Sequence, residues 1–313
     1  MTAYIIRRLL ATIPVMIVVA LFVFLLLHLT PGDPAAVIAG DDASPAEIDG
    51  IRRKLGLDRP IWEQFVIYVG NLLNGDLGTS IFSNLPVLTL VKQRLEPTLV
   101  LAVSTLVVAV AFAVPLGVLA AWKARTLIDR VVMGFSVLGF ALPVFLIGYL
   151  LIYVFAIELR WLPVQGYKPL SQGLVGTARS VALPAFALGM IYMALIARIT
   201  RASMLEVLSE DYIRTARAKG VATPSLLLRH ALKNAAVPIV TVIGIGMTLL
   251  ISGVVLTETV FNIPGLGRLT VDAILKRDYP IIQGLIIIFA GVKVLVNLMI
   301  DISYTFFDPR IRY

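Results

Sequence analysis

The feature that most constrains this chain is a series of uncharged, apolar runs, each near or above the length that crosses a membrane. Five runs carry no charged residue, at 9–32, 97–122, 131–157, 180–197 and 234–257, and a sixth at 279–300 is interrupted only by Lys293. A helix needs ~20 apolar residues to span the hydrocarbon core of a bilayer. We therefore predict an all-α integral membrane protein with six transmembrane helices.

The composition agrees with this fold class. Hydrophobic residues make up 59% of the 313 residues and charged residues only 15%, whereas soluble domains carry ~25% charged residues. Arg7 and Arg8 before the first run resemble the start of a signal peptide, but Pro31–Pro34 follows where a small-residue cleavage site would be expected. We expect an uncleaved first span at 9–30.

The basic residues predict the orientation of the chain. A net charge of +8 can indicate a nucleic-acid partner. However, Lys and Arg are densest at the N-terminus, at 123–130, at 198–233 and at the C-terminus, and basic loops mark the cytoplasmic side of a membrane protein. We expect both termini in the cytoplasm and no nucleic-acid partner. There is no cysteine, and His28 and His230 are too few for a His-rich metal site.

Two parts of unequal character follow from this pattern. Residues 1–96 hold the first transmembrane helix and an extracytoplasmic segment, while 97–313 hold a core of five transmembrane helices with a cytoplasmic loop at 198–235. Within 31–96, Ser44-Pro45 followed by Glu47 predicts a helix start. Apolar residues at helical spacing predict a second helix from Ile61 to Leu72. We expect these helices to form a small layer packed on the membrane core.

The main polar segment is Ser209–Asn234, between two apolar runs. Ser209 is predicted to cap a helix whose first turn holds Glu210 and Asp211. Gly220 suits the left-handed position that ends such a helix, and Thr223-Pro224 is predicted to restart one as N-cap and first residue. The segment therefore predicts a helix-turn-helix.

This helix-turn-helix has two interpretations. It could lie on the membrane surface, but its apolar face (Tyr212, Ile213 and Ala216) is small and its charges are mixed. We favour a docking element for a soluble partner, because a rigid helix pair leading into the span after Ala235 can transmit motion to that span.

No motif for catalysis is present. The sequence lacks a P-loop, an H-E-x-x-H helix and a G-x-S-x-G elbow, so we predict that the chain is not an enzyme. Lys293 is the one charge deep in a span. It is a candidate for the translocation path, or it pairs with a polar group on a neighbouring helix. An alternative function is a stand-alone ion-coupled carrier or channel that uses Lys293 and Asp301.

The end of the fifth run holds a second candidate region. Glu258 is either a solvated helix end or a cap or gate contact. The loop after it contains Phe261, Pro264, Gly265 and Gly267, and proline with glycine predicts a turn. We expect this loop to fold back on the outer mouth of the core, or to form an ordinary packed hairpin.

The motifs together resemble a known family. YIRTARAKG followed by RHALKNAAVP is similar to the cytoplasmic "EAA" loop of ABC importer permeases, and in particular of the dipeptide, oligopeptide and nickel uptake family. Further similar segments run along the whole chain: HLTPGDPAAVIAG, LGLDRPIWEQF, GDLGTS, WLPVQGY, VFNIPGLG, RDYP and DISYTFFDPRIRY. The PGDP segment resembles the longer, first-type permease of that family. The Glu of the generic pattern is absent, since Arg214, Thr215 and Ala216 stand six to four residues before Gly220.

The resemblance implies a fold, a function and partners. The fold would be the membrane domain of a type I ABC importer, with an extracytoplasmic segment between helices 1 and 2. The function would be ATP-driven import of short peptides by alternating access across the bacterial inner membrane, although dipeptides, oligopeptides, glutathione and nickel complexes all remain open as substrates. The implied partners are a second homologous permease subunit, two ATPase subunits that carry ATP-Mg, and an extracytoplasmic binding protein; no cofactor is implied in this chain.

The resemblance also assigns two surfaces. A groove on the ATPase would receive a set of residues that we call the coupling set: Tyr212, Arg214, Thr215, Ala216, Arg217, Ala218, Lys219 and Gly220. The binding protein would dock near 31–96 and 260–267, so Glu258, Phe261, Pro264, Gly265 and Gly267 are candidates for its side of the chain or for an outer gate.

Overall fold

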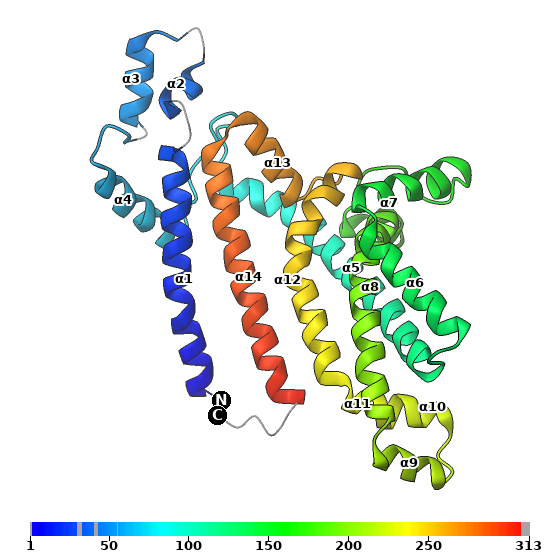
Figure 1. Ribbon diagram of the computed structural model, residues 1–313. Coiled ribbons are helices and arrows are strands. Elements are labelled where there is room, and N and C mark those ends of the chain that lie inside the picture. The colour runs from blue at the N-terminus through cyan, green and yellow to red at the C-terminus, as the bar shows by residue number, and fades with distance from the viewer. Residues whose placement is uncertain (1, 30–32, 41–42, 55, 308–313) are drawn as a thin grey trace. The chain divides into compact units, whose positions relative to one another are not determined.

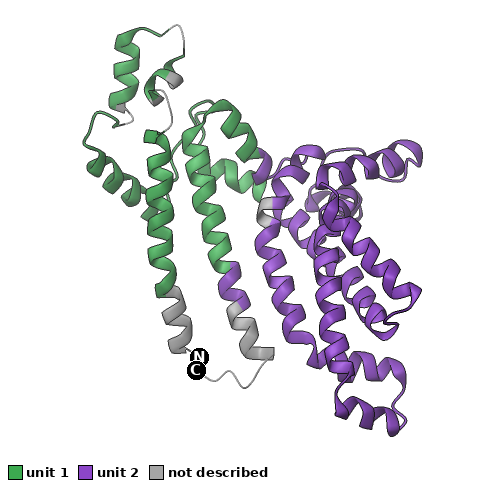
Figure 2. Ribbon diagram, viewed as in Figure 1, with its two compact units in different colours: residues 1–95, 269–295 green, residues 96–268, 296–313 purple. Residues whose placement is uncertain are grey.

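The computed structural model describes residues 2–29, 33–40, 43–54 and 56–307. All regular elements in these ranges are helices, apart from one isolated bridge between Thr79 and Pro86 (Figure 1). The helices belong to two compact units, of which one contains 1–95 with 269–295 and the other 96–268 with 296–313 (Figure 2).

The predicted helical membrane fold is confirmed. Among the described residues, four helices are long and apolar enough to cross a membrane, and each of two bent helix pairs can serve as one further span, giving up to six. The four are α1 (Thr2–Leu29), α5 (Val87–Trp122), α8 (Leu174–Leu208) and α14 (Tyr279–Phe307).

The run at 131–157 does not form one straight helix. It folds as α6 (Leu127–Ala141) followed by α7 (Val144–Leu151) and the π-helix η1 (Ile152–Glu158). The chain bends by 108° between α6 and the α7–η1 segment. The reason is Pro143, because a proline disfavours helical backbone at the residue before it. Leu142 accordingly has an extended ψ of 133°.

The first unit contains the two predicted short helices, α3 (Pro45–Lys54) and α4 (Ile61–Leu73). It also contains α2 (Pro34–Ala39) and most of α13 (Leu266–Lys276), which were not predicted. The predicted start of α3 is confirmed: the Ser44 backbone and hydroxyl groups each donate a 2.8 Å hydrogen bond to the Glu47 carboxylate, which forms a capping box.

Side-chain contacts connect the elements of this unit. On α1, the Phe24 ring packs edge-on against Phe65 of α4 at 5.3 Å. The α1 and α14 helices run side by side, and the Gln283 side chain donates to the backbone oxygen of Val23 at 3.1 Å (Figure 1). The Ser80 hydroxyl donates a 2.6 Å hydrogen bond to Asp278 at the start of α14, and both residues are buried.

The second unit is built around α8. This helix is mostly buried, and its side chains pack with those of α5, α7 and α12 (Ala236–Val260) in one core that includes Leu188, Tyr192, Ile196, Leu250 and Val254. Five short elements complete the unit: the 3-10 helix η2 (Leu170–Gln172), α9 (Asp211–Ala218), α10 (Thr223–Ser225), the π-helix η3 (Leu226–Ala231) and α11 (Leu232–Asn234).

Candidate functional site

The predicted helix-turn-helix is present, at the end of α8 and α12 that is opposite the 260–267 loop (Figure 1). Its first boundary was predicted wrongly. Ser209 is the C-cap residue that follows α8, where its hydroxyl donates to the Glu206 backbone oxygen, and it does not cap α9. Because α8 continues to Leu208, the extended residue that opens α9 is Glu210, with ψ 148°.

Gly220 ends α9 as predicted. Its φ is +79°, and the Gly220 amide donates to the Arg217 oxygen while the Val221 amide donates to the Ala216 oxygen. These two bonds form a Schellman motif, whose left-handed residue is favoured to be glycine because it has no Cβ. The turn is therefore well defined by its backbone.

The restart of the second helix is displaced by one residue. Ala222 is the N-cap of α10, and Thr223 and Pro224 occupy its first and second positions. The prediction of Thr223 as N-cap and Pro224 as first residue was therefore wrong by one position. Proline is tolerated there because the first-turn amides have no partner within the helix.

One buried side chain fixes α9 to the second unit. Ile213 is only 1% exposed and packs in a small core with Met204 of α8, with Leu226 and Leu227 of η3, and with neighbours from α5 and α12. The Asn234 amide also donates a 2.8 Å hydrogen bond to the Tyr212 hydroxyl, which joins α9 to α11. The helix pair is therefore packed against the spans on both sides of it.

The coupling set divides between surface and interior. Ala216 is half-buried, and the remaining seven residues are exposed: Tyr212, Arg214, Thr215, Arg217, Ala218, Lys219 and Gly220. The Arg214 guanidinium lies 3.2 Å from the Asp211 carboxylate, but both groups are strongly exposed, so this ion pair is weak. The outward surface of α9 is therefore cationic and accessible.

The sequence reasoning missed an ion pair in the same unit. The Arg201 guanidinium on α8 donates to both oxygens of Asp129 on α6, and Asp129 is only 4% exposed. The Arg125 amide donates a third hydrogen bond to that carboxylate at 2.9 Å. The pair joins the α5–α6 turn to the helix that leads into α9. Asp129 is the one acidic residue of the basic segment 123–130, and this isolated acid could have indicated an ion pair from the sequence.

Glu258, at the other end of α12, is not a solvated helix end. It is fully buried and accepts a 2.6 Å hydrogen bond from the Thr98 hydroxyl and a 2.9 Å bond from the Arg268 amide. The Thr98 hydroxyl in turn accepts from the Leu266 amide. Glu258 and Thr98 therefore cap the first turn of α13, where a carboxylate is also favoured by the helix dipole.

The two glycines of the loop are required by this contact. A Cβ on Gly265 would lie 2.0 Å from Glu258 Oε1, and one on Gly267 would lie 2.6 Å from Val255 Cα. Glycine is thus the residue that lets the loop approach the carboxylate.

The loop folds back onto the second unit. Phe261, Ile263 and Leu266 are buried, while Pro264 is exposed. The Phe261 backbone oxygen accepts a 3.0 Å hydrogen bond from the Gly166 amide, so the VFNIPGLG and WLPVQGY segments lie together. Next to Gly166, the Tyr167 hydroxyl donates to Glu96 Oε1 at 2.8 Å.

Lys293 is exposed on α14, and no hydrogen bond or ion pair joins it to another described residue. The side chain of Asp301 lies outside the described residues. Within the described ranges, no cluster of three or more His, Asp or Glu side chains could hold a metal ion.

Comparisons with known proteins agree with the resemblance in the motifs. The family model described as "Binding-protein-dependent transport system inner membrane component" matches residues 113–313, and that described as "Binding-prot-dependent transport system membrane comp, N-term" matches residues 1–102.

Two relatives match along the whole length of both chains. The chain is 55% identical over 313 residues to the "Probable peptide ABC transporter permease protein y4tP" of Sinorhizobium fredii. It is 44% identical over 314 residues to the "Glutathione transport system permease protein GsiC" of Escherichia coli, again with 100% of each chain covered.

These matches favour an ABC importer subunit over the ion-coupled carrier. The prediction that the chain is a transport subunit and not an enzyme is confirmed. The family also implies ATPase and substrate-binding partners. The chain belongs to the family of binding-protein-dependent transport system inner membrane components, and it is a membrane permease subunit of an ABC importer.

Proposed function

We propose that the exposed surface of α9, formed by the coupling set, is where an ATPase subunit docks, and that α9–α11 transmit its motion to the spans. The observation that supports this most directly is the packing of Ile213. A docking helix transmits force only if it is fixed to the helices that must move, and Ile213 is buried in a core that includes residues of α8 and α12.

The assembly that we propose has two halves. A second homologous permease subunit forms the other half of the pore, and two ATPase subunits bind ATP-Mg and supply the energy. The chain crosses the inner membrane with both termini in the cytoplasm, which the density of basic residues supports. The 31–96 segment and the 260–267 loop then lie on the extracytoplasmic side, where the binding protein docks.

The substrate class that we propose is short peptides. The support is the names of the relatives, one a probable peptide permease and one a glutathione permease, since glutathione is itself a tripeptide.

Two substitutions at Gly220 test the docking. A Cβ at Gly220 meets no atom within 4 Å, so a side chain there costs only backbone strain in this chain. Asn tolerates the left-handed backbone, whereas Val does not. If Gly220 contacts an ATPase subunit, Gly220→Asn and Gly220→Val both insert into the membrane and both abolish peptide uptake. Normal uptake by both variants contradicts the proposal.

Cross-linking gives an independent test, because the chain contains no cysteine. Arg217→Cys should form a cross-link to the ATPase subunit in membranes that contain the whole importer. Thr126→Cys, which is exposed in the α5–α6 turn, is the matched control and should form none. Equal cross-linking from both positions rules out a specific contact at α9.

A further inference from the structure

A pocket of about 540 Å³ lies inside the first unit. Its walls come from the last turns of α1, the C-terminal part of α3, the 56–59 turn, α4, the 76–81 loop and the first turn of α14. We call it the α1–α4 pocket. Apolar side chains such as Phe24, Leu27 and Ile67 make up much of its surface. Its size is typical of sites that hold a small molecule.

The pocket lies at the depth of lipid headgroups. Phe24 and Leu27 are near the end of the α1 span, Leu10–Leu29, and Gln283 is near the start of the α14 span, Tyr279–Ile300. The ends of transmembrane helices lie at the membrane–water interface. The pocket is therefore level with the boundary between headgroups and acyl chains.

The exposed face of α4 supports the same depth. Ile61, Trp62, Val66 and Leu73 are each at least 50% exposed on this short helix. A helix with such a face is stable when it lies in the membrane interface, where tryptophan is also enriched. This places the wall that α4 contributes beside the lipid.

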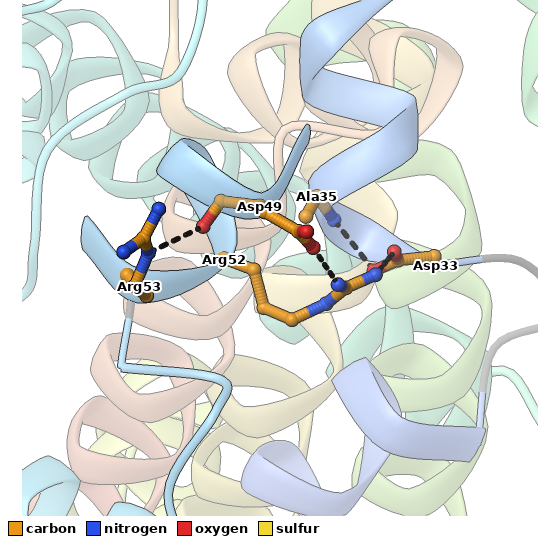
Figure 3. A network of polar contacts seen from close by, with 5 residues as sticks. All are labelled: Asp33, Ala35, Asp49, Arg52 and Arg53. Carbon is orange, nitrogen blue, oxygen red and sulfur yellow. Dashed lines mark hydrogen bonds and ion pairs between the residues drawn. The ribbon is translucent and has the colours of Figure 1, made fainter. Parts of the chain in front are cut away.

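The pocket also carries positive charge that no described carboxylate neutralises. Arg53 and Arg59 are exposed residues of its lining, and neither is in an ion pair with a described residue. The neighbouring Arg52 differs, because it pairs with both Asp33 and Asp49 (Figure 3). Among the described contacts, the Arg53 side chain makes one long hydrogen bond, of 3.4 Å, to the Asp49 backbone oxygen.

A hydroxyl in the lining lacks a partner. The Tyr68 oxygen is buried and makes no hydrogen bond within the described structure. A buried hydroxyl without a partner costs free energy, so such a group calls for an explanation. Burial also raises the pKa of Tyr68 to about 12, so that the hydroxyl keeps its proton and can donate it.

We propose that the α1–α4 pocket binds an anionic phospholipid, with Arg53 and Arg59 holding the phosphate and the Tyr68 hydroxyl donating to the headgroup. The acyl chains extend over the exposed apolar side chains of α1 and α14. Asp76 also lines the pocket, and its carboxylate accepts from the Gly78 amide. The phosphate is accordingly held on the arginine side, away from that carboxylate.

The test measures phospholipid retained by the purified importer with all its subunits. Native mass spectrometry is applied after titration of delipidated protein with phosphatidylglycerol, with phosphatidylcholine or with inorganic phosphate. Arg53→Gln/Arg59→Gln should lower the affinity for phosphatidylglycerol about 30-fold, since each basic residue contributes about fivefold near an anionic headgroup. Tyr68→Phe removes only the unpaired hydroxyl, so it should fold normally and lower the affinity by a smaller factor.

The control removes two cations of the same unit that lie outside the pocket. Lys92→Gln/Lys276→Gln should retain phosphatidylglycerol as the wild type does. Unchanged retention by Arg53→Gln/Arg59→Gln overturns the proposal, and so does an equal loss in the control variant. Binding of inorganic phosphate with equal affinity shows an anion site without lipid selectivity, and preferential binding of phosphatidylcholine shows a site without charge selectivity; either result overturns it.

Discussion

The Thr98 hydroxyl donates a 2.6 Å hydrogen bond to the Glu258 carboxylate, across 160 positions of sequence. In the first turn of α13, the Thr98 hydroxyl accepts a hydrogen bond from the Leu266 amide, and the Glu258 carboxylate accepts one from the Arg268 amide. The start of the second apolar run and the end of the fifth are therefore joined by a polar contact that also holds the start of α13.

Glu258→Ala should strongly destabilise the second unit. The change leaves the half-buried Thr98 hydroxyl and the Arg268 amide without their Glu258 acceptor, and each buried unsatisfied group costs ~1–3 kcal/mol. Glu258→Gln keeps one acceptor oxygen and should cost less. Thermal unfolding of the purified importer, followed by circular dichroism, measures both. The exposed neighbour Thr259→Ala is the control, and an equal shift in all three variants contradicts a specific role for Glu258.

Gly265→Ala should also lower the melting temperature. Its Cβ would meet Glu258 Oε1 at 2.0 Å, so the loop or the carboxylate must move and the cap of α13 is weakened. Gly134→Ala is the matched control, because no atom lies within 4 Å of a Cβ there. In a helix, Gly→Ala without a clash stabilises by ~0.5–1 kcal/mol. Opposite signs for the two changes are expected in the same unfolding measurement.

Ile213→Ala should release α9 from the second unit. Removing a fully buried isoleucine side chain costs ~2–5 kcal/mol, which here falls on one short helix. Limited proteolysis between 209 and 222 should become faster, while the spans remain inserted. Ile213→Val, which removes a single methylene, should change the cleavage rate much less. Resistance of the Ala variant to protease would show that other contacts hold α9.

The Asp129–Arg201 pair should show strong coupling between its two members. Removing one partner of a fully buried ion pair costs ~3–5 kcal/mol, because the other charge stays uncompensated. The cost should be smaller here for Asp129→Asn, since the Arg201 side chain that is left is 27% exposed. Asp129→Asn and Arg201→Gln are therefore each expected to destabilise, and the double variant should cost less than their sum. A double-mutant cycle on thermal stability measures this coupling. Additive effects mean that the two groups act independently.

The capping box of α3 should depend on pH. The backbone hydrogen bond from Ser44, followed by that from its hydroxyl, lowers the pKa of Glu47. A lowered pKa in the folded state means that the stabilisation is present above the usual carboxylate pKa and is lost as the pH falls through the folded value. Protection of the 43–54 amides, measured by hydrogen exchange relative to the intrinsic exchange rate at the same pH, should therefore fall at acidic pH. Ser44→Ala, which removes the hydroxyl, should lower this protection at neutral pH as well.

Local signals in the sequence predicted several elements correctly. The Ser44–Glu47 box and the Gly220 turn each depend on residues that are close in the chain, so propensity and capping rules suffice. The start of α9 was predicted wrongly at Ser209 because α8 continues past its apolar run, and no local rule reports how far a helix extends once tertiary contacts support it.

By itself, the sequence determined that the chain is a helical membrane protein and a permease subunit, because apolar run length and ordered motifs carry that information. Only the tertiary structure decided which distant residues meet. It buried Glu258 against Thr98 and joined Asp129 to Arg201. It also placed around one pocket the Tyr68 hydroxyl and two arginines that form no ion pair with a described residue. The physical reason is that such contacts depend on how helices pack, and residue spacing along the chain does not specify that packing.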